Sequence, residues 1–308
     1  MEITYTVDKV DKLDNILREK LKMSRRVIKE CEQDILVNGV HRLRNQLLNI
    51  GDVILVSLKE VILEEEKFIN KYAKVEEELD ILYEDEYLLA VNKPSNMPVH
   101  PSCNNYDNTL SNIVAPYLAK QNVFGIHIVT RLDKDTSGVC IFAKHPYIQE
   151  LFNLKKKDLN IKKEYLCVVK GIIKNQHEII EQPIKRKENS IILREVNNEG
   201  QYAKTEYFVE KLNKKDNFSI LKVLLHTGRT HQIRVHMSYI GHPLLGDDLY
   251  EKETEKENIL KLIQRQALHC NKIKFTHPIT GNKICIISNL PQDIKTLIED
   301  KNCIFVAK

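Results

Sequence analysis

The chain has 308 residues, which is long enough for a full catalytic domain and a small accessory domain. Its 47 Lys and Arg residues nearly balance 43 Asp and Glu residues, so the net charge of +4 excludes a uniformly basic coat. Seven cysteines without a Cys-x-x-Cys pair argue against a disulfide framework or a zinc ribbon, and no apolar run approaches the ~20 residues of a membrane span. We therefore expect a soluble, cytoplasmic protein with reduced thiols and no membrane partner.

Residues 1–62 are predicted to form a small α+β domain of their own. Apolar residues at helical spacing indicate two helices, and Ser24 is a suitable N-cap for the second. An Asn-Gly pair indicates a tight turn after the first strand. The predicted elements are helices at 12–21 and 24–31, a strand at 35–40, and a turn and strand at 51–56. This pattern resembles the S4 RNA-binding domain.

One face of this domain is expected to be basic. Its six cations outnumber the nearby acidic residues and are Lys22, Arg25, Arg26, Lys29, Arg42 and Arg44. Such a face suits phosphate contacts, although an ordinary solvated helix surface is the alternative. Because the S4 domain docks against structured RNA through its helical face, the resemblance implies that Arg25 and Arg26 bind the RNA.

A shift toward acidic residues separates this domain from the rest of the chain. Two runs of three glutamates, at 64–66 and 76–78, predict an exposed acidic linker over 63–79. In the domain from 80 to 308, β-rich runs outnumber helical ones, which predicts an α+β fold with a large mixed or antiparallel sheet. Strands are expected at 87–92, 139–143, 164–170, 205–211, 217–225 and 282–288, and helices at 109–120, 146–155, 229–239, 257–264 and 291–299.

The run RLDKDTSG at 131–138 is the feature that carries most information about function. It lies between the apolar segments 126–129 and 139–143, and it places Asp133 in a polar turn between two strand-like stretches. Loops on a rigid sheet are where enzymes hold nucleophiles and general bases, although an Asx-turn closed by Gly138 is the structural alternative. The full run resembles the catalytic motif of the RluA-type pseudouridine synthases, in which the Asp at this position attacks the target uridine.

Further segments resemble the same family in the same order. Together they span residues 80 to 295 and are 81–94, 97–101, 163–171, 228–236, 241–247, 267–269 and 275–278. The resemblance implies the fold of the pseudouridine synthase catalytic domain. It also implies a reaction in which the bond from uracil N1 to C1′ breaks and a bond from C5 to C1′ forms.

The resemblance assigns roles to three catalytic residues. Asp133 is the nucleophile, Tyr165 stacks on the target uracil, and Arg234 supplies the cation beside the carboxylate. Physical chemistry agrees with the last assignment, because a buried carboxylate drifts toward its neutral form unless a cation lies beside it. A planar guanidinium can hold one oxygen of Asp133 while the other faces the nucleotide. Whether Asp133 attacks C1′, adds to C6 or removes the 2′ proton stays open.

Other cations are candidates for binding the substrate. Arg131 and Arg229 belong to the matched motifs, and Lys163 belongs to a cationic patch that also contains Lys155, Lys156, Lys157 and Lys162. A second patch lies at 185–187. Both patches suit RNA, and a solvated surface is the alternative.

No cofactor or metal is expected. The chain has no Gly-x-Gly-x-x-Gly run, no Walker loop and no His-Glu-x-x-His run. His231 and His236 are five residues apart, which does not place them on one helix face, and His127 is remote in sequence.

These patterns predict a monomeric RNA pseudouridine synthase of the RluA type that acts without a cofactor. We expect its substrate to be large-subunit ribosomal RNA, the 23S molecule, with tRNA as the alternative. A non-catalytic RNA-binding factor in ribosome assembly is a competing hypothesis, and intact Asp133, Tyr165 and Arg234 argue against it. A metal-dependent nuclease would need clustered carboxylates, for which Asp133 and Asp135 are the nearest pair.

Overall fold

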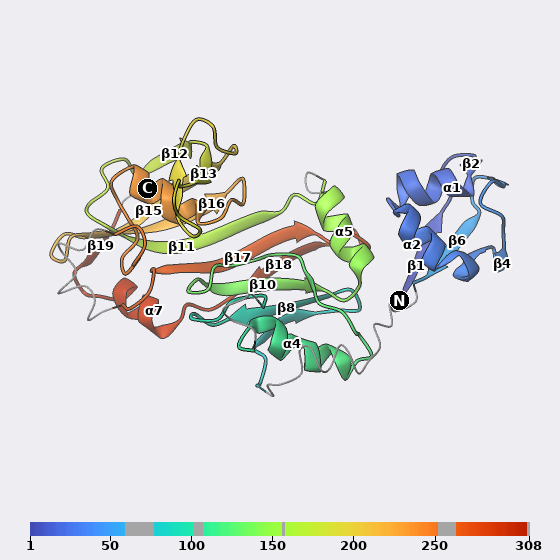
Figure 1. Cartoon of the computed structure of the whole chain (residues 1–308), viewed down its shortest axis with the longest axis horizontal. Helices are drawn as coiled ribbons and strands as arrows, with labels where there is room; N and C mark the ends of the chain where they lie inside the picture. The colour runs from blue at the N-terminus through green and yellow to red at the C-terminus, as the bar shows by residue number, and fades with distance from the viewer. Residues whose placement is uncertain (59–76, 102–106, 156–157, 252–262, 307–308) are drawn as a thin grey trace.

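A computed structural model describes residues 1–58, 77–101, 107–155, 158–251 and 263–306. Figure 1 shows a small N-terminal module at one end of the molecule and a larger domain built on one long sheet. The predicted acidic linker at 63–79 lies outside the described residues except for 77–79, which have no regular structure. No helix in the described part of the chain is long and apolar enough to cross a membrane.

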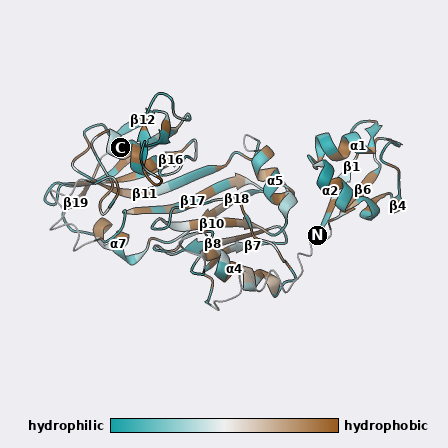
Figure 2. Ribbon diagram, viewed as in Figure 1, coloured by the Kyte–Doolittle hydropathy of each residue, from teal (hydrophilic) through white to brown (hydrophobic). Residues whose placement is uncertain are grey.

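The N-terminal module is an antiparallel sheet packed with four short helical segments. Its sheet has the strand order β1-β6-β3-β4, and a separate pair joins β2 to β5. The elements are β1 Glu2–Thr6, β2 Asp11–Lys12, α1 Leu13–Asn15, η1 Ile16–Lys20, α2 Arg25–Glu30, η2 Glu32–Asp34, β3 Ile35–Val37, β4 Val40–His41, β5 Leu47–Leu48 and β6 Val53–Ser57. The helices show both hydrophilic and hydrophobic residues in Figure 2, as expected of helices with one buried face.

Local sequence signals in this module are confirmed. The Ser24 side chain accepts a hydrogen bond of 3.4 Å from the backbone N–H of Val27 and caps α2 as predicted. Asn38 and Gly39 both have positive φ, +51° and +79°, which is the backbone of a tight turn between β3 and β4. The expected helix at 12–21 is present as α1 followed by the π-helical segment η1.

The large domain contains an 11-stranded mixed sheet. Its main strand order is β12-β15-β16-β11-β17-β10-β8-β7, with β18 beside β17, β19 beside β15 and β9 beside β10. The strands are β7 Ile81–Glu84, β8 Leu88–Lys93, β9 His127–Ile128, β10 Ser137–Ala143, β11 Lys162–Lys170, β12 His177–Glu181, β15 Lys204–Asn213, β16 Phe218–Leu225, β17 Leu268–Thr276, β18 Lys283–Ile287 and β19 Cys303–Phe305. The pairing of β10 with β17 is parallel and the other described pairings of this sheet are antiparallel. The predicted α+β class with a large mixed sheet is therefore confirmed.

Helices cover both faces of this sheet. On one face, α4 (Leu110–Ala119) packs with Leu89 and Phe142, and α7 (Gln292–Ile298) packs with Val168. On the other face, α5 (Pro146–Leu154) and α6 (Gln232–Tyr239) share a core with Ile141 and Tyr165. Side chains alternate between the faces along each strand, so the sheet has two apolar surfaces and a core on each side.

The predicted elements agree with the structure in kind, and the differences have local causes. All six predicted strands are present, but β12, β17 and β19 were not predicted, nor was the separate antiparallel pair of β13 (Ile184–Arg186) and β14 (Arg194–Val196). The helix expected at 229–239 begins only at Gln232, because His231 has a left-handed backbone, with φ +55°, and ends a turn. The helix expected at 257–264 lies outside the described residues except for 263–264, which are not helical.

The parallel pairing of β10 and β17 depends on a glycine. Gly138 has φ +116°, and a Cβ atom there would lie 2.2 Å from the carbonyl oxygen of Cys270 on β17. The pairing brings Ser137 beside His269 and Gly138 beside Cys270. Only glycine fits this close approach, so Gly138, which ends the 131–138 run, is required to join the two strands.

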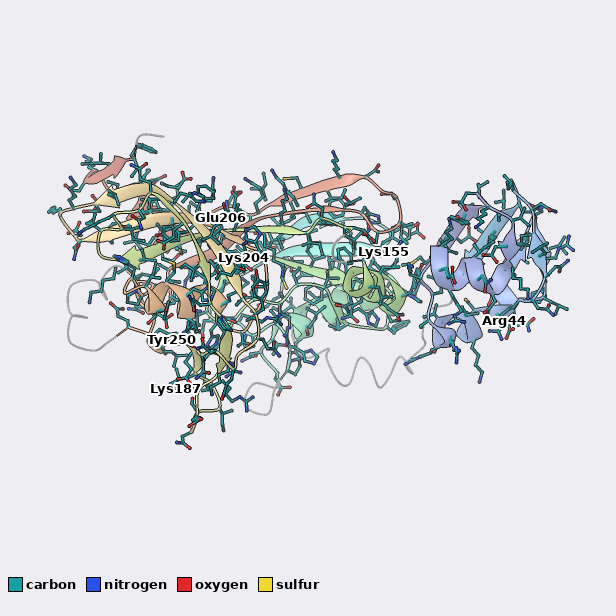
Figure 3. The ribbon with its side chains drawn as sticks, turned by 90° about the horizontal axis from the view of Figure 1, so that it is seen from above. Arg44, Lys155, Lys187, Lys204, Glu206 and Tyr250 are labelled. Carbon is teal, nitrogen blue, oxygen red and sulfur yellow. The ribbon has the colours of Figure 1, made fainter. Side chains whose placement is uncertain are left out.

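The N-terminal module contacts the large domain at α5 and at the turn before β8. The hydroxyl of the buried Tyr147 donates a hydrogen bond to the backbone carbonyl of Leu21. The Tyr87 hydroxyl donates a second bond of 3.3 Å to the carbonyl of Glu2. Figure 3 shows Lys155, at the end of α5, next to the module that carries Arg44.

Candidate active site

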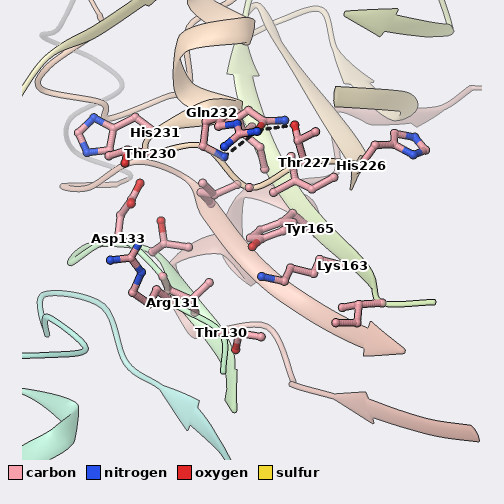
Figure 4. A pocket seen from close by; sticks show the side chains of 18 of the residues that line it. Thr130, Arg131, Asp133, Lys163, Tyr165, His226, Thr227, Thr230, His231 and Gln232 are labelled. Atoms are coloured by element: carbon pink, nitrogen blue, oxygen red, sulfur yellow. Dashed lines mark hydrogen bonds between the residues drawn. The ribbon is translucent and has the colours of Figure 1, made fainter. Parts of the chain in front are cut away.

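A pocket of about 760 Å³ opens on the face of the sheet that carries α5 and α6. Its walls come mainly from the turn between β9 and β10, the start of β11 and the turn that leads into α6, and residues of α5 and β17 complete the lining. Asp133, Tyr165 and Arg234 all line this pocket, so the fold brings together the three residues predicted to be catalytic. Figure 4 shows Asp133 and Arg131 on one side of the pocket, and Tyr165 and Lys163 on the other.

Asp133 is held in a rigid turn. The backbone N–H of Thr136 donates a 3.1 Å hydrogen bond to the carbonyl of Asp133. The next carbonyl, that of Lys134, accepts 2.8 Å from the ammonium of Lys93, which is completely buried and also binds the carbonyls of Pro94 and Met97. The Asp133 side chain remains 28% exposed and faces the pocket. The turn thus fixes the backbone while the carboxylate stays accessible.

Arg234 is bound chiefly by a different carboxylate from the one expected. Its Nε and Nη2 atoms donate to the two oxygens of Asp247, both at 2.7 Å, and Asp247 is completely buried. Its Nη1 atom lies 3.9 Å from Oδ2 of Asp133, an ion pair without a hydrogen bond. Burial disfavours the charged guanidinium, but the hydrogen bonds and charge of Asp247, together with the charge of Asp133, outweigh it and raise the pKa of Arg234.

Tyr165 provides the aromatic wall of the pocket. It lies on β11 where the register with β17 shifts between Glu164 and Leu166, and such irregularities often re-aim side chains beside active sites. Its side chain is only 5% exposed. Burial first, then the charge of Cys270 and a hydrogen bond to its thiol, raise the pKa of Tyr165 well above its usual range. The phenol is therefore neutral, and the residue forms part of the pocket wall.

A histidine missed as a pocket residue stands next to Arg234. His231 Nδ1 lies 2.9 Å from the Tyr250 hydroxyl, whose ring lies under the Arg234 guanidinium at 5.1 Å from its centroid. That hydroxyl accepts a hydrogen bond of 2.9 Å from the backbone N–H of Arg194, so its own hydrogen is free to point at His231. Burial lowers the pKa of His231. The left-handed backbone that ends the turn directs this neutral ring toward the pocket.

The predicted substrate-binding residues divide into two groups. Arg131, Lys163 and Arg229 line the pocket. Part of the hydrogen-bonding capacity of Arg229 is used within the protein, because the guanidinium donates 2.9 Å bonds to the Tyr202 carbonyl and to the Gln201 side chain.

The second group lies in the N-terminal module and does not reach the pocket. Arg25 and Arg26 are exposed on α2. Arg26 forms a 2.8 Å ion pair with Glu30, and Arg44 pairs with Glu32 at 3.2 Å. The expected basic face is therefore partly neutralised by its own acidic neighbours, although such exposed pairs are weak.

Two buried charged residues that support the site, Asp247 and Lys93, were not predicted from the sequence. Asp247 lies in a matched motif, but its pairing with Arg234 could be recognised only once α6 was placed against the following turn. Lys93 is the last residue of β8, within an Asn-Lys-Pro run, and the signal that could have found it is a lysine at the end of an apolar strand.

Two of the three histidines considered as metal ligands, His231 and His236, are engaged in other contacts. The ring of His236 is bonded to Thr205 Oγ1 and to the carbonyl of Gln182, each at 2.9 Å. Among the residues that the structure describes, no group of three or more His, Cys, Asp or Glu side chains could hold a metal ion. The clustered carboxylates that a two-metal nuclease requires are not found in this part of the chain.

Comparisons with known proteins agree with this geometry. A family model described as RNA pseudouridylate synthase matches residues 87–239. The uncharacterized RNA pseudouridine synthase YhcT of Bacillus subtilis (strain 168) is 36% identical over 288 residues, 92% of this chain and 91% of the relative. Ribosomal large subunit pseudouridine synthase D of Zymomonas mobilis subsp. mobilis is 36% identical over 233 residues, 72% of each protein.

A solved structure shows the same fold. The human RNA pseudouridylate synthase domain containing 1 superposes with a TM-score of 0.57 at 24% identity, over 70% of this chain and 84% of that protein. The family model, the long alignments with relatives and the fold point to one group of enzymes. The chain belongs to the RNA pseudouridine synthase family and is an enzyme that converts uridine in RNA to pseudouridine.

Proposed function

We propose that this enzyme modifies specific uridines of large-subunit ribosomal RNA, the 23S molecule, with Asp133 as the nucleophile and without a cofactor. The observation that carries the proposal is the placement of Asp133, Tyr165 and Arg234 on one pocket, with the carboxylate 3.9 Å from a guanidinium. The choice of ribosomal RNA is supported by relatives that are named ribosomal large subunit pseudouridine synthase D.

The chemistry can be derived from the pocket's own side chains. The N1–C1′ bond of uridine breaks, the C5–C1′ bond forms, C5 loses a proton and N1 gains one, so no electrons or groups are exchanged with another molecule. Asp133 supplies a carboxylate that can attack carbon or remove a proton, and its charge is supported by Arg234. There are three possible first steps: attack at C1′, addition to C6 and removal of the 2′ proton. Each of them uses a carboxylate oxygen of Asp133.

The target base must leave its stack to reach Asp133. A volume of about 760 Å³ is ample for one flipped nucleotide. The ring of Tyr165 offers a stacking face, worth about 1–3 kcal/mol per base. We propose that Arg131, Lys163 and Arg229, which line the pocket, hold the neighbouring phosphates.

The N-terminal module extends the proposed RNA contact. We propose that residues 1–62 form an S4-like RNA-binding domain, that 63–79 form a linker, and that 80–308 form the catalytic domain. The proposal is supported by the antiparallel sheet β1-β6-β3-β4, which forms with α2 a separate small module at the start of the chain. Arg25 and Arg26 lie exposed on α2, where phosphate oxygens can reach them.

The proposal also covers the state of the protein in the cell. We propose a cytoplasmic monomer. All six cysteines that the structure describes are free thiols, and four of them are buried, which suits a reducing compartment.

The experiment is carbodiimide-based mapping of pseudouridine in total RNA from cells with and without this chain. Loss of particular signals in 23S rRNA that return with the wild-type chain, and not with Asp133→Asn, is the expected result. Loss of signals in tRNA instead would retain the enzyme and correct the substrate. Restoration of all signals by Asp133→Asn would reject Asp133 as the nucleophile. Unchanged maps together with a defect in ribosome assembly would favour a non-catalytic role.

A further inference from the structure

A second buried arginine contacts the catalytic turn without lining the pocket. Arg265 is only 9% exposed, and it is not among the residues that line the pocket. Its Nη1 donates to the carbonyl of Asp135 at 3.0 Å, and its Nη2 donates to the hydroxyl of Ser137 at 3.3 Å. Its Nε and Nη2 form a two-pronged ion pair with Asp293 at 2.7 and 3.1 Å. One planar group thus joins α7 to the turn, and Arg265 itself is 130 residues away from Asp135 along the chain.

We propose that Arg265 is a positioning residue for the reaction: anchored by Asp293, it fixes the turn so that the Asp133 carboxylate stays aimed at the substrate. The inference rests on the proposed role of Asp133 and deepens it. Asp135 lies two residues after Asp133, inside the turn that the Thr136 N–H closes at 3.1 Å. Because its carbonyl is held by Arg265, the peptide plane cannot rotate, and the nucleophile cannot turn away from the pocket.

The guanidinium is suited to this task because it is planar and has five fixed N–H donors. Its Nη1 also donates to the carbonyls of Gln266 and Leu268, each at 3.2 Å, so a single orientation serves all of its partners. Asp293 balances the charge, which a buried arginine requires. A lysine has one ammonium and cannot reach Asp293 and the Asp135 carbonyl together.

The network continues to β17 and has a defined direction. Arg265 can only donate, so the hydroxyl hydrogen of Ser137 is free to donate to His269 Nδ1, 2.9 Å away. The other ring nitrogen of His269 then donates to the carbonyl of Ser288 at 3.4 Å. Burial lowers the pKa of His269 to about 4, so the ring is neutral and can accept this hydrogen bond. The turn is therefore fixed at Asp135, and the start of β10 is fixed at Ser137.

The test separates positioning from folding and from RNA binding. In the full-length protein, kcat and KM are measured on a transcript that contains the mapped uridine, together with the thermal unfolding midpoint. For Arg265→Lys we expect kcat to fall about 10- to 100-fold while KM changes less than twofold, since Arg265 does not line the pocket. Asp293→Asn keeps an acceptor but loses the charge, so we expect an intermediate fall in kcat. Lys295→Gln, on the same helix with a 49% exposed side chain, is the control and should match the wild type.

The outcomes distinguish this inference from the proposed function. If Arg265→Lys and Asp293→Asn both turn over at the wild-type rate, the positioning role is wrong. If kcat falls only in proportion to the folded fraction, Arg265 is a structural residue and the inference also fails. If Arg265→Lys does not fold, Asp293→Asn provides the test: wild-type turnover, or a fall in kcat that only follows the folded fraction, would reject the positioning role. If instead Asp133→Asn retains full turnover in the same assay, the nucleophile itself is wrong, whatever Arg265 does.

Discussion

Arg234→Lys tests whether the buried ion pair with Asp247 holds the catalytic cation in place. Lysine keeps the charge but cannot form both of the 2.7 Å bonds that Nε and Nη2 make to a completely buried carboxylate. Breaking a buried pair costs about 3–5 kcal/mol, and retention of the charge places this change near 3 kcal/mol. For a domain of about 150–250 residues, that lowers the unfolding midpoint by roughly 6–12 °C.

The same substitution should reduce turnover. The ammonium will follow the buried Asp247 and withdraw from Asp133, which already lies 3.9 Å from the guanidinium. Loss of about 2 kcal/mol of charge interaction corresponds to about a 30-fold fall in kcat. The assays are thermal unfolding and release of tritium from RNA labelled at uridine C5. Arg229→Lys, at an exposed arginine, is the stability control.

The reasoning would be refuted by an Arg234→Lys protein that melts within 2 °C of the wild type. That result would show that the two short bonds to Asp247 contribute little to stability. Wild-type turnover in the same variant would show that Asp133 does not depend on a fixed guanidinium.

Four further predictions concern single residues. Asp133→Asn should abolish tritium release. It should leave the unfolding midpoint within about 1 °C of the wild type, because the Asp133 side chain is 28% exposed and makes no short bond to Arg234. A large loss of stability would contradict this. Tyr165→Leu should lower kcat/KM about 10- to 100-fold through lost stacking, while an unchanged value would exclude the stacking role. Gly138→Ala should cost more than about 2 kcal/mol in urea unfolding, since its Cβ would lie 2.2 Å from the Cys270 carbonyl oxygen at a φ of +116°, and a neutral effect would contradict the close approach. Burial lowers the pKa of His269 from 6.5 to about 4, so the neutral ring contributes its full stability above pH 6.5 and this stability is lost as the pH falls toward 4. The total loss is about 3 kcal/mol, at about 1.4 kcal/mol per pH unit. His269→Gln should therefore lose less stability between pH 7 and pH 5 than the exposed control His41→Gln, and equal losses would refute the assignment.

Local signals in the sequence were sufficient for much of the fold. Ser24 as a helix cap, the Asn38-Gly39 turn and the strands β8, β10 and β11 are all encoded within a few neighbouring residues. Their conformations follow from side-chain capping, backbone freedom and apolar periodicity, which act over short distances. For this reason they could be predicted without any knowledge of distant contacts.

The strand β17 shows where this reasoning stops. It lies between β10 and β11 at the centre of the sheet, yet it was not predicted, because His269 and Asn271 interrupt its apolar pattern. His269 is completely buried because Ser137 and Ser288 satisfy its ring nitrogens. A polar residue becomes a core residue only when its partners arrive from elsewhere in the chain.

The sequence by itself was sufficient to predict the α+β class, the motif that carries Asp133 and, through the family resemblance, that Tyr165 and Arg234 lie with Asp133 on one pocket. Only the tertiary structure decided that Arg234 is bound by Asp247 and that Arg265 joins α7 to the catalytic turn. The physical reason is that hydrogen bonds and ion pairs depend on distance in space, whereas motifs and periodicities are properties of neighbours along the chain. Arg265 and Asp135 are 130 residues apart in sequence and 3.0 Å apart in the folded protein.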